Sequence, residues 1–115
     1  MPRAVPDCRP DELTSRNDVA RVLTSGRAFH GDRVVVFVAP GSGTVAFVAG
    51  RRVGGAVVRN RARRILRAAW WELAPRVREG FDIALVARGT ICATRSHELV
   101  PEVEGLLTRA GVMAP

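Results

Sequence analysis

The sequence predicts an α+β fold, a two-layer α/β sandwich with a small mixed sheet of about four strands in the order αβββαβα. Three observations support it: two β-branched runs at 33–39 and 44–49, a long amphipathic helix at 56–73, and a further strand and helix after it. A chain of 115 residues has room for one core. We therefore expect a single domain over 11–112, preceded by a flexible segment, 1–10, that contains three prolines.

The first element after the flexible segment is predicted to be a helix. Asp11 or Ser15 can cap its start, because a short polar side chain satisfies free backbone N–H groups of the first turn. Apolar residues recur at the spacing i, i+3 and i+4, which places them on one face: Val19, Val22 and Leu23. Gly26 is expected to end this helix in the left-handed conformation that glycine tolerates best.

The strands are predicted from their composition. The runs RVVVFVA at 33–39 and TVAFVA at 44–49 are rich in β-branched and aromatic residues. Residues 40–43 between them, Pro-Gly-Ser-Gly, have the composition of a hairpin connection, so we expect these two strands to pair. The run DIALVAR at 82–88 predicts another strand after the long helix.

Two helices are expected to cover one face of this sheet. The longer runs from about Ala56 to Leu73 and ends before Pro75, which cannot continue it. One stripe of this helix is apolar and is predicted to face the core: Val58, Ala62, Ile65, Leu66, Ala69 and Leu73. The last helix starts within 96–101 and reaches about Ala110, ahead of a glycine.

Charge is strongly biased along the chain. The net charge is +7, and all 18 basic residues are arginine. Seven of them lie between Arg51 and Arg67 with no acidic residue among them, whereas Glu98 to Glu104 holds three glutamates and no basic residue. Arginine offers a planar fork that binds phosphate oxygens bidentately and stacks on bases, which suits RNA.

The side of the long helix opposite the apolar stripe is predicted to bind a polyanion. It carries Asn60, Arg63, Arg64, Arg67 and Trp71, with Arg59 and Arg61 on the flanks. Burial of five guanidinium groups without carboxylates would cost more in desolvation than packing returns. In water, like charges at this spacing repel by roughly 0.2 to 0.5 kcal/mol per pair. When an anionic partner binds, the electrostatic energy of these charges becomes favourable. Trp70 and Trp71 are open to two interpretations, core packing or base stacking.

Other functional classes find little support in the sequence. No apolar run approaches the roughly 18 residues of a membrane span, and the N-terminus lacks an apolar secretory core, so we expect a cytoplasmic protein. The two cysteines, Cys8 and Cys92, and the two histidines, His30 and His97, are too few and scattered to predict a metal site or a nucleophilic triad. We therefore expect no catalytic residue and no metal ligand in the protein itself.

The segment VGGAVVRNRARRILRAAW at 53–70 resembles the motif of the bacterial ribonuclease P protein subunit, an Arg-Asn-Arg triplet followed by further basic residues. The order of elements agrees from Leu13 to Arg109. The resemblance implies a sandwich like domain 2 of ribosomal protein S5, with a left-handed βαβ crossover against the usual preference. It also implies that eight residues contact the RNA subunit: Arg51, Arg52, Arg59, Asn60, Arg61, Arg63, Arg64 and Arg67.

The resemblance further implies a role in tRNA maturation. The protein would assist a catalytic RNA, with which it pairs 1:1, in removing the 5′ leader of precursor tRNA. Hydrolysis would be carried out by Mg²⁺ ions held mainly by the RNA, with no cofactor bound by the protein alone. No membrane and no obligate protein partner is implied.

A surface for the single-stranded leader is also implied, at positions where this chain differs from the family. The aromatic positions of the first helix hold Val19 and Leu23, whereas Phe37 on the first long strand matches. Glycine and serines that are common before the double-arginine pair are replaced by Ala46, Val48 and Gly50.

Three alternatives remain. A structural RNA-binding protein of the ribosomal type would share the fold and take no part in processing. A protein-only nuclease would need ligands from Asp32, Asp82 and the two histidines, which are scattered. A DNA-binding helix fits less well, because the arginines spread around more than half of the circumference instead of one edge.

Overall fold

The computed structural model describes residues 16–41, 43–93 and 95–113. Its helices are α1 (Arg16–Ser25), α2 (Ala56–Leu73) and α3 (Ser96–Ala110), and its strands are β1 (Arg27–His30), β2 (Val34–Pro40), β3 (Val45–Val48) and β4 (Phe81–Ala87). Three short 3-10 helices connect them, η2 (Arg51–Val53), η3 (Ala74–Arg76) and η4 (Gly89–Ala93). The order αβββαβα and the α+β class are as expected, and α2 has the predicted bounds.

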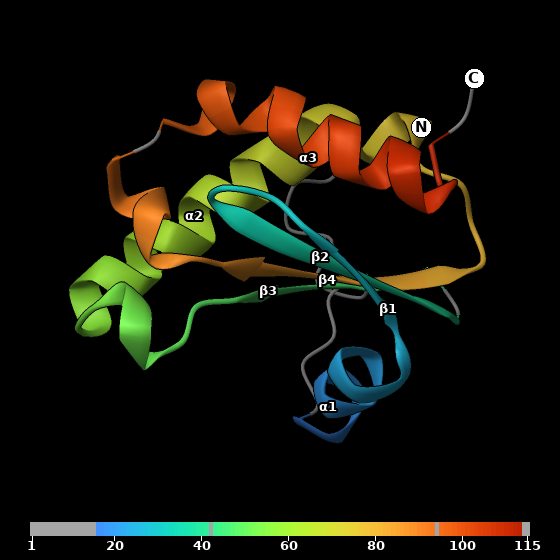
Figure 1. Ribbon diagram of the computed structural model, residues 1–115, viewed down its shortest axis with the longest axis horizontal. Coiled ribbons are helices and arrows are strands. Elements are labelled where there is room, and N and C mark those ends of the chain that lie inside the picture. Colours follow the sequence, from blue (N-terminus) through green and yellow to red (C-terminus); the bar gives the residue numbers. More distant parts are fainter. Residues whose placement is uncertain (1–15, 42, 94, 114–115) are drawn as a thin grey trace.

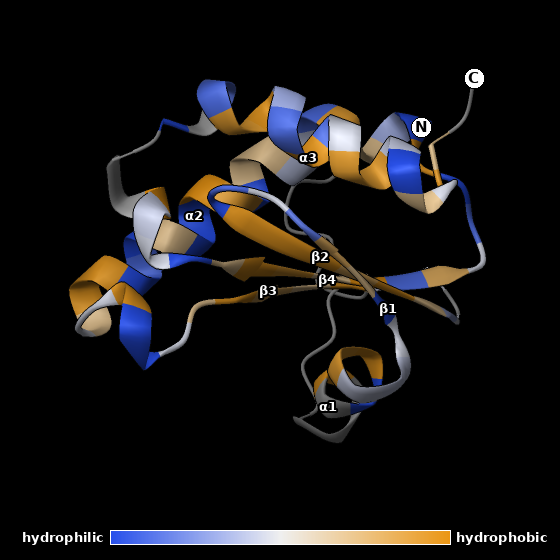
Figure 2. Ribbon diagram, viewed as in Figure 1, coloured by the Kyte–Doolittle hydropathy of each residue, from blue (hydrophilic) through white to orange (hydrophobic). Residues whose placement is uncertain are grey.

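The helices lie on both sides of the sheet. Figure 1 shows α2 and α3 side by side across one face, while α1 lies alone against the other. The strands β2, β3 and β4 are the most continuous apolar segments of the described chain, and the helices alternate between apolar and hydrophilic residues (Figure 2). The sequence predicted the α2 and α3 layer but did not place α1. No helix in the described part of the chain is long and apolar enough to span a membrane.

The predicted pairing of the two long strands is wrong. The sheet has the order β1-β2-β4-β3, so β4 lies between β2 and β3. Leu85 of β4 is opposite Val36 of antiparallel β2 and Phe47 of parallel β3. The strands β3 and β4 are joined through α2 and form the expected βαβ unit.

The glycine-rich connection after β2 crosses the end of β4 instead of making a hairpin. The backbone N–H of Gly41 donates to the carbonyl of Gly80 at 2.9 Å, and that of Thr44 donates to the Asp82 carboxylate at 3.1 Å. The true hairpin joins β1 and β2, with Phe29 opposite Val36. Composition could not separate these arrangements, because β2 and β3 are both largely buried and neither shows a simple polar alternation.

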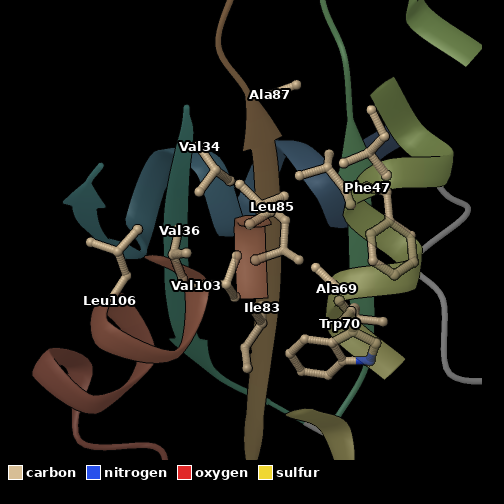
Figure 3. Close-up of a cluster of buried hydrophobic side chains, with 14 of the residues drawn as sticks. Val34, Val36, Phe47, Ala69, Trp70, Ile83, Leu85, Ala87, Val103 and Leu106 are labelled. Carbon is tan, nitrogen blue, oxygen red and sulfur yellow. The ribbon is translucent and has the colours of Figure 1, made fainter. Parts of the chain in front are cut away.

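The main core fills the space between the sheet and the α2 and α3 layer. Val36, Ile83 and Leu85 of the sheet point toward Trp70 of α2 and Val103 of α3 (Figure 3). Trp70 is 7% exposed and belongs to the core. Full burial of an aliphatic side chain contributes roughly 1.5 to 3 kcal/mol, so this layer supplies most of the stabilisation.

The apolar stripe of α2 is confirmed except at its first residue. Five predicted residues are buried: Ala62, Ile65, Leu66, Ala69 and Leu73. Val58 is 36% exposed and Val57 is 80% exposed, so the first turn of α2 projects beyond the edge of the sheet. The periodicity gave the correct face but could not show where the sheet beneath the helix ends.

The glycine predicted to follow α3 has the expected conformation, whereas the one predicted to follow α1 does not. Gly111 follows α3 with φ 78°, in the left-handed conformation typical of a helix C-terminus. Gly26 follows α1 as expected, but it is not among the glycines with positive φ. Its requirement is space, because a Cβ atom there would lie 2.4 Å from the carbonyl oxygen of Val22. The predicted caps Asp11 and Ser15 and the segment 1–10 lie outside the described residues.

Candidate RNA-binding surface

The outer side of α2 presents a basic surface, which we call the arginine face: Arg59, Asn60, Arg61, Arg63, Arg64 and Arg67. Asn60, Arg61 and Arg64 are exposed, while Arg59, Arg63 and Arg67 are half-buried. Four of these residues, with Val57, line a shallow hollow of about 460 Å³: Asn60, Arg63, Arg64 and Arg67. These four predicted residues therefore lie together, whereas Arg59 and Arg61 do not line the hollow.

Two contacts hold individual side chains of this surface in place. Arg63 donates a hydrogen bond to the side-chain oxygen of Asn60, one turn earlier on α2. The guanidinium of Arg67 lies 5.0 Å from the centre of the Phe47 ring, a cation–π contact that ties the arginine face to β3. Both contacts restrict rotamers and so lower the entropic cost of ordering these side chains on a ligand.

The arginine face has little internal charge compensation. Within residues 16–41, 43–93 and 95–113, no carboxylate pairs with Arg59, Arg61 or Arg64. The acidic residues of α3 are used for structure instead. Glu102 accepts the backbone N–H of Arg33 at 2.8 Å, and Glu104 pairs with Arg76 at 3.0 Å. The positive potential of α2 is thus available to an external anion.

Arg51 and Arg52 extend the arginine face toward the end of the sheet. Both are exposed on η2, directly before α2. Gly54 turns the chain from η2 into α2 with φ 149°, a conformation that side chains rarely adopt. Gly50 precedes η2 in extended conformation and is exposed.

Two further arginines at this end of the sheet were missed in the sequence analysis. Arg33 precedes β2 and Arg88 follows β4, and the backbone N–H of Arg88 donates to the carbonyl of Arg33 at 2.8 Å. Arg88 is exposed, and η4 after it packs beside η2, which carries Arg52. Antiparallel pairing of β2 with β4 brings them together, so only the strand order could have revealed them.

A second surface lies on the opposite face of the sheet, around α1. Val19 and Leu23 of α1, Phe37 of β2 and Val48 of β3 are half-buried and pack around one small cluster; we call these four the α1 patch. The cluster beneath is built from Val22 and three alanines: Ala39, Ala46 and Ala84. The structure therefore brings together the three residues assigned by resemblance to the leader surface, although they are far apart in sequence.

Asp82 and Trp71, the remaining candidates for a functional role, are both packed into the fold. Asp82, a possible nuclease ligand, is 2% exposed and is bound by Arg21 and Thr44. Its burial opposes ionisation, but the backbone and hydroxyl hydrogen bonds from Thr44 and the Arg21 guanidinium hold the pKa of Asp82 below its usual range. Trp71 is half-buried and packs against the core. No group of three or more His, Cys, Asp or Glu residues gathers within the described part of the chain.

Known proteins resemble this chain over nearly its whole length. The sequence profile of the family Ribonuclease P matches residues 8–111. The ribonuclease P protein component of Symbiobacterium thermophilum is 43% identical over 105 residues, which are 88% of this chain and 91% of the relative. That of Dehalococcoides mccartyi is 35% identical over 107 residues, 90% of this chain and 88% of the relative.

Solved structures show the same fold. The Staphylococcus aureus RNase P protein superposes with a TM-score of 0.77 at 19% identity, covering 90% of this chain and 97% of its own. The Thermotoga maritima RNase P protein superposes with a TM-score of 0.73 at 22% identity, and the match covers 85% of this chain and 96% of the solved one. From the family profile, the relatives and the arrangement of the arginine face, we conclude that this chain belongs to the family of ribonuclease P protein components.

Proposed function

We propose that the protein binds the ribonuclease P RNA through the arginine face and holds the leader of precursor tRNA on the α1 patch. The observation that carries the proposal is the arginine face, which is solvent-accessible and poor in carboxylates and in which Arg63 and Arg67 are held by contacts with Asn60 and Phe47. Each arginine that neutralises a phosphate releases a counterion, so affinity should fall steeply with salt. Membership of the family supports an RNA partner, for which we propose 1:1 stoichiometry.

The α1 patch has the chemistry to hold a single-stranded nucleic acid. Phe37 offers a half-buried aromatic ring on which a base can stack, and Val19, Leu23 and Val48 surround it with apolar surface. Val19 and Leu23 stand where the family has aromatic residues. Of the three positions that the resemblance assigns to the leader, Phe37 is therefore the one that can stack on a base. We therefore expect a leader contribution that is modest and tolerant of sequence.

The protein's role is binding and positioning. Mg²⁺ ions held mainly by the RNA would supply the hydrolytic chemistry, by activating water and stabilising the leaving oxygen. The arginines would lower the repulsion between RNA phosphates and so lower the magnesium concentration needed for folding and cleavage. We propose the cytoplasm, where precursor tRNA is made, as the place of action.

Cleavage of precursor tRNA at low magnesium by a bacterial ribonuclease P RNA, with and without the purified protein, tests this function. We expect stimulation with a product that begins at the mature 5′ end, and no cleavage by the protein alone. Tight RNA binding without stimulation would favour the structural RNA-binding alternative. Cleavage by the protein alone would contradict the proposed division of labour.

A further inference from the structure

Asp82 is the single buried charged side chain of the described core, and it lies where α1 meets the sheet. Its Oδ1 atom accepts hydrogen bonds from the Thr44 hydroxyl at 2.8 Å, the Thr44 backbone N–H at 3.1 Å and the Gly43 backbone N–H at 3.2 Å. Its Oδ2 atom pairs with the guanidinium of Arg21 from α1. One carboxylate thus joins α1, the β2–β3 connection and β4.

The apolar contact beneath α1 is small. The sheet presents Ala39, Ala46 and Ala84 to this helix, and among the α1 side chains that the structure describes Val22 is fully buried. Alanines let the helix approach closely but offer few atoms that would fix its orientation. Directional polar contacts therefore have a larger share in positioning α1 than in positioning α2 or α3.

The surroundings of the ion pair are shaped to fit it. A Cβ atom at Gly41 would lie 2.1 Å from Asp82 Oδ2, so a larger residue there would displace the carboxylate. Arg21 also donates to the carbonyl of Pro40 at 3.4 Å, which adds a contact between α1 and the last residue of β2. Val19 and Leu23, two residues before and two residues after Arg21 on α1, belong to the α1 patch.

We propose that Asp82 is a positioning residue that, through Arg21, fixes α1 against the sheet and thereby sets the affinity of the α1 patch for the leader. The proposal rests on the proposed function of that patch. Asp82 is buried and touches no RNA itself. Its effect is on the distance and angle at which Val19 and Leu23 face Phe37.

Two substitutions disrupt the pair from opposite sides. Asp82→Asn keeps the size of the side chain but places an amide, which can donate, opposite Arg21. Arg21→Met keeps an apolar stem on a helix position that is 44% exposed, so it should fold even if the buried variant does not. Arg21→Lys retains the charge and serves as the conservative variant. Arg76→Met, which breaks the exposed Arg76–Glu104 pair, is the matched control.

Two quantities are measured on the reconstituted holoenzyme or the free protein. The first is the leader contribution, defined as the ratio of half-saturating concentrations in single-turnover cleavage for a substrate with a one-nucleotide leader and one with a long leader. The second is amide hydrogen exchange of α1 in the free protein. Affinity for the RNA subunit is followed in parallel and should not change, because the arginine face lies on the other side of the sheet.

We expect Asp82→Asn and Arg21→Met each to speed exchange in α1 and to lower the leader contribution about threefold to tenfold. The double variant should lose no more than either single one, because the two groups act as one pair. Arg21→Lys should retain most of the leader contribution, and Arg76→Met all of it. Additive losses in the double variant would overturn the inference, as would unchanged exchange in α1.

Leu23→Ala separates this inference from the proposed function. If Leu23→Ala lowers the leader contribution while Asp82→Asn and Arg21→Met leave it unchanged, the α1 patch binds the leader but Asp82 does not position it. If Leu23→Ala also has no effect, the leader does not bind the α1 patch, and both proposals fail.

Discussion

The two faces of the sheet are built from different residues although they share the same strands. Along β4, Ile83 and Leu85 point to the α2 and α3 layer, whereas Asp82 and Ala84 point to α1. The first face is covered by two long helices and buries large aliphatic side chains. Within the described residues, the second face is covered by one ten-residue helix that rests on alanines. We infer that the first face stabilises the fold and that the second keeps apolar groups accessible for binding.

The largest effect should come from the stabilising face. Leu85→Ala removes a fully buried side chain between the sheet and both covering helices, and it should lower the free energy of unfolding by about 2 to 5 kcal/mol. Leu23→Ala, in the half-buried α1 patch, should cost far less. Urea denaturation of both variants measures the difference, and equal losses would contradict the assignment of stability to one face.

Substitutions on the arginine face should weaken RNA binding and leave the free energy of unfolding nearly unchanged. Arg64→Ala removes an exposed guanidinium that has no carboxylate partner in the described structure, and it should weaken RNA-subunit binding by about 1 to 3 kcal/mol. It should also reduce the slope of log affinity against log salt by about one. A filter-binding titration across salt gives both values. An unchanged slope would mean that Arg64 does not contact phosphate.

Acid should act on the α1 side of the sheet through Asp82. Because the folded pKa of Asp82 is lowered, its contribution is present above the unfolded pKa of about 3.9 and is lost as pH falls through the folded pKa. Asp82→Asn should cost about 1 to 2 kcal/mol near neutral pH, since Arg21 is partly exposed. The gap between wild type and variant in unfolding experiments should narrow below about pH 4. If the difference in unfolding free energy widened below this pH, the pKa of Asp82 would not be lowered in the folded protein.

The smallest effect should come from the exposed ion pair between η3 and α3. Arg76 and Glu104 are 3.0 Å apart with side chains 51% and 41% exposed, so solvent screens the pair. Arg76→Met should change the free energy of unfolding by less than about 1 kcal/mol. Thermal unfolding at low and high salt checks this. A loss as large as that of Asp82→Asn would show that exposure does not distinguish the two pairs.

Features determined by local pattern were predicted well. The end of α2 follows from Pro75, and the core residues from Ala62 to Leu73 and the opposite basic side follow from helical periodicity. Gly111 was also placed correctly, because a glycine after an amphipathic helix is a local signal. The gathering of Asn60, Arg63, Arg64 and Arg67 around one hollow follows directly from the same helical periodicity.

Features determined by long-range pairing were not predicted from pattern alone. The insertion of β4 between β2 and β3 requires a crossover connection and is accompanied by the hydrogen bond from the Thr44 backbone to Asp82, and neither leaves a local signature in the sequence. The approach of Arg33 to Arg88 follows from that strand order. Gly26 also differs from its predicted role, because a Cβ atom there would lie 2.4 Å from the Val22 carbonyl oxygen of α1 and 3.0 Å from the Val38 carbonyl oxygen of β2.

The measurement that tests the account most directly compares Phe37→Ala with the double variant Arg63→Ala/Arg64→Ala in the same two assays, RNA-subunit affinity and leader contribution. We expect the double arginine variant to lose more than tenfold in RNA-subunit affinity, consistent with about 1 to 3 kcal/mol per arginine, and to keep its leader contribution at saturating protein. Phe37→Ala should show the reverse. If both variants change the same quantity, the proposal that one face of the protein binds the RNA subunit and the other binds the leader is contradicted.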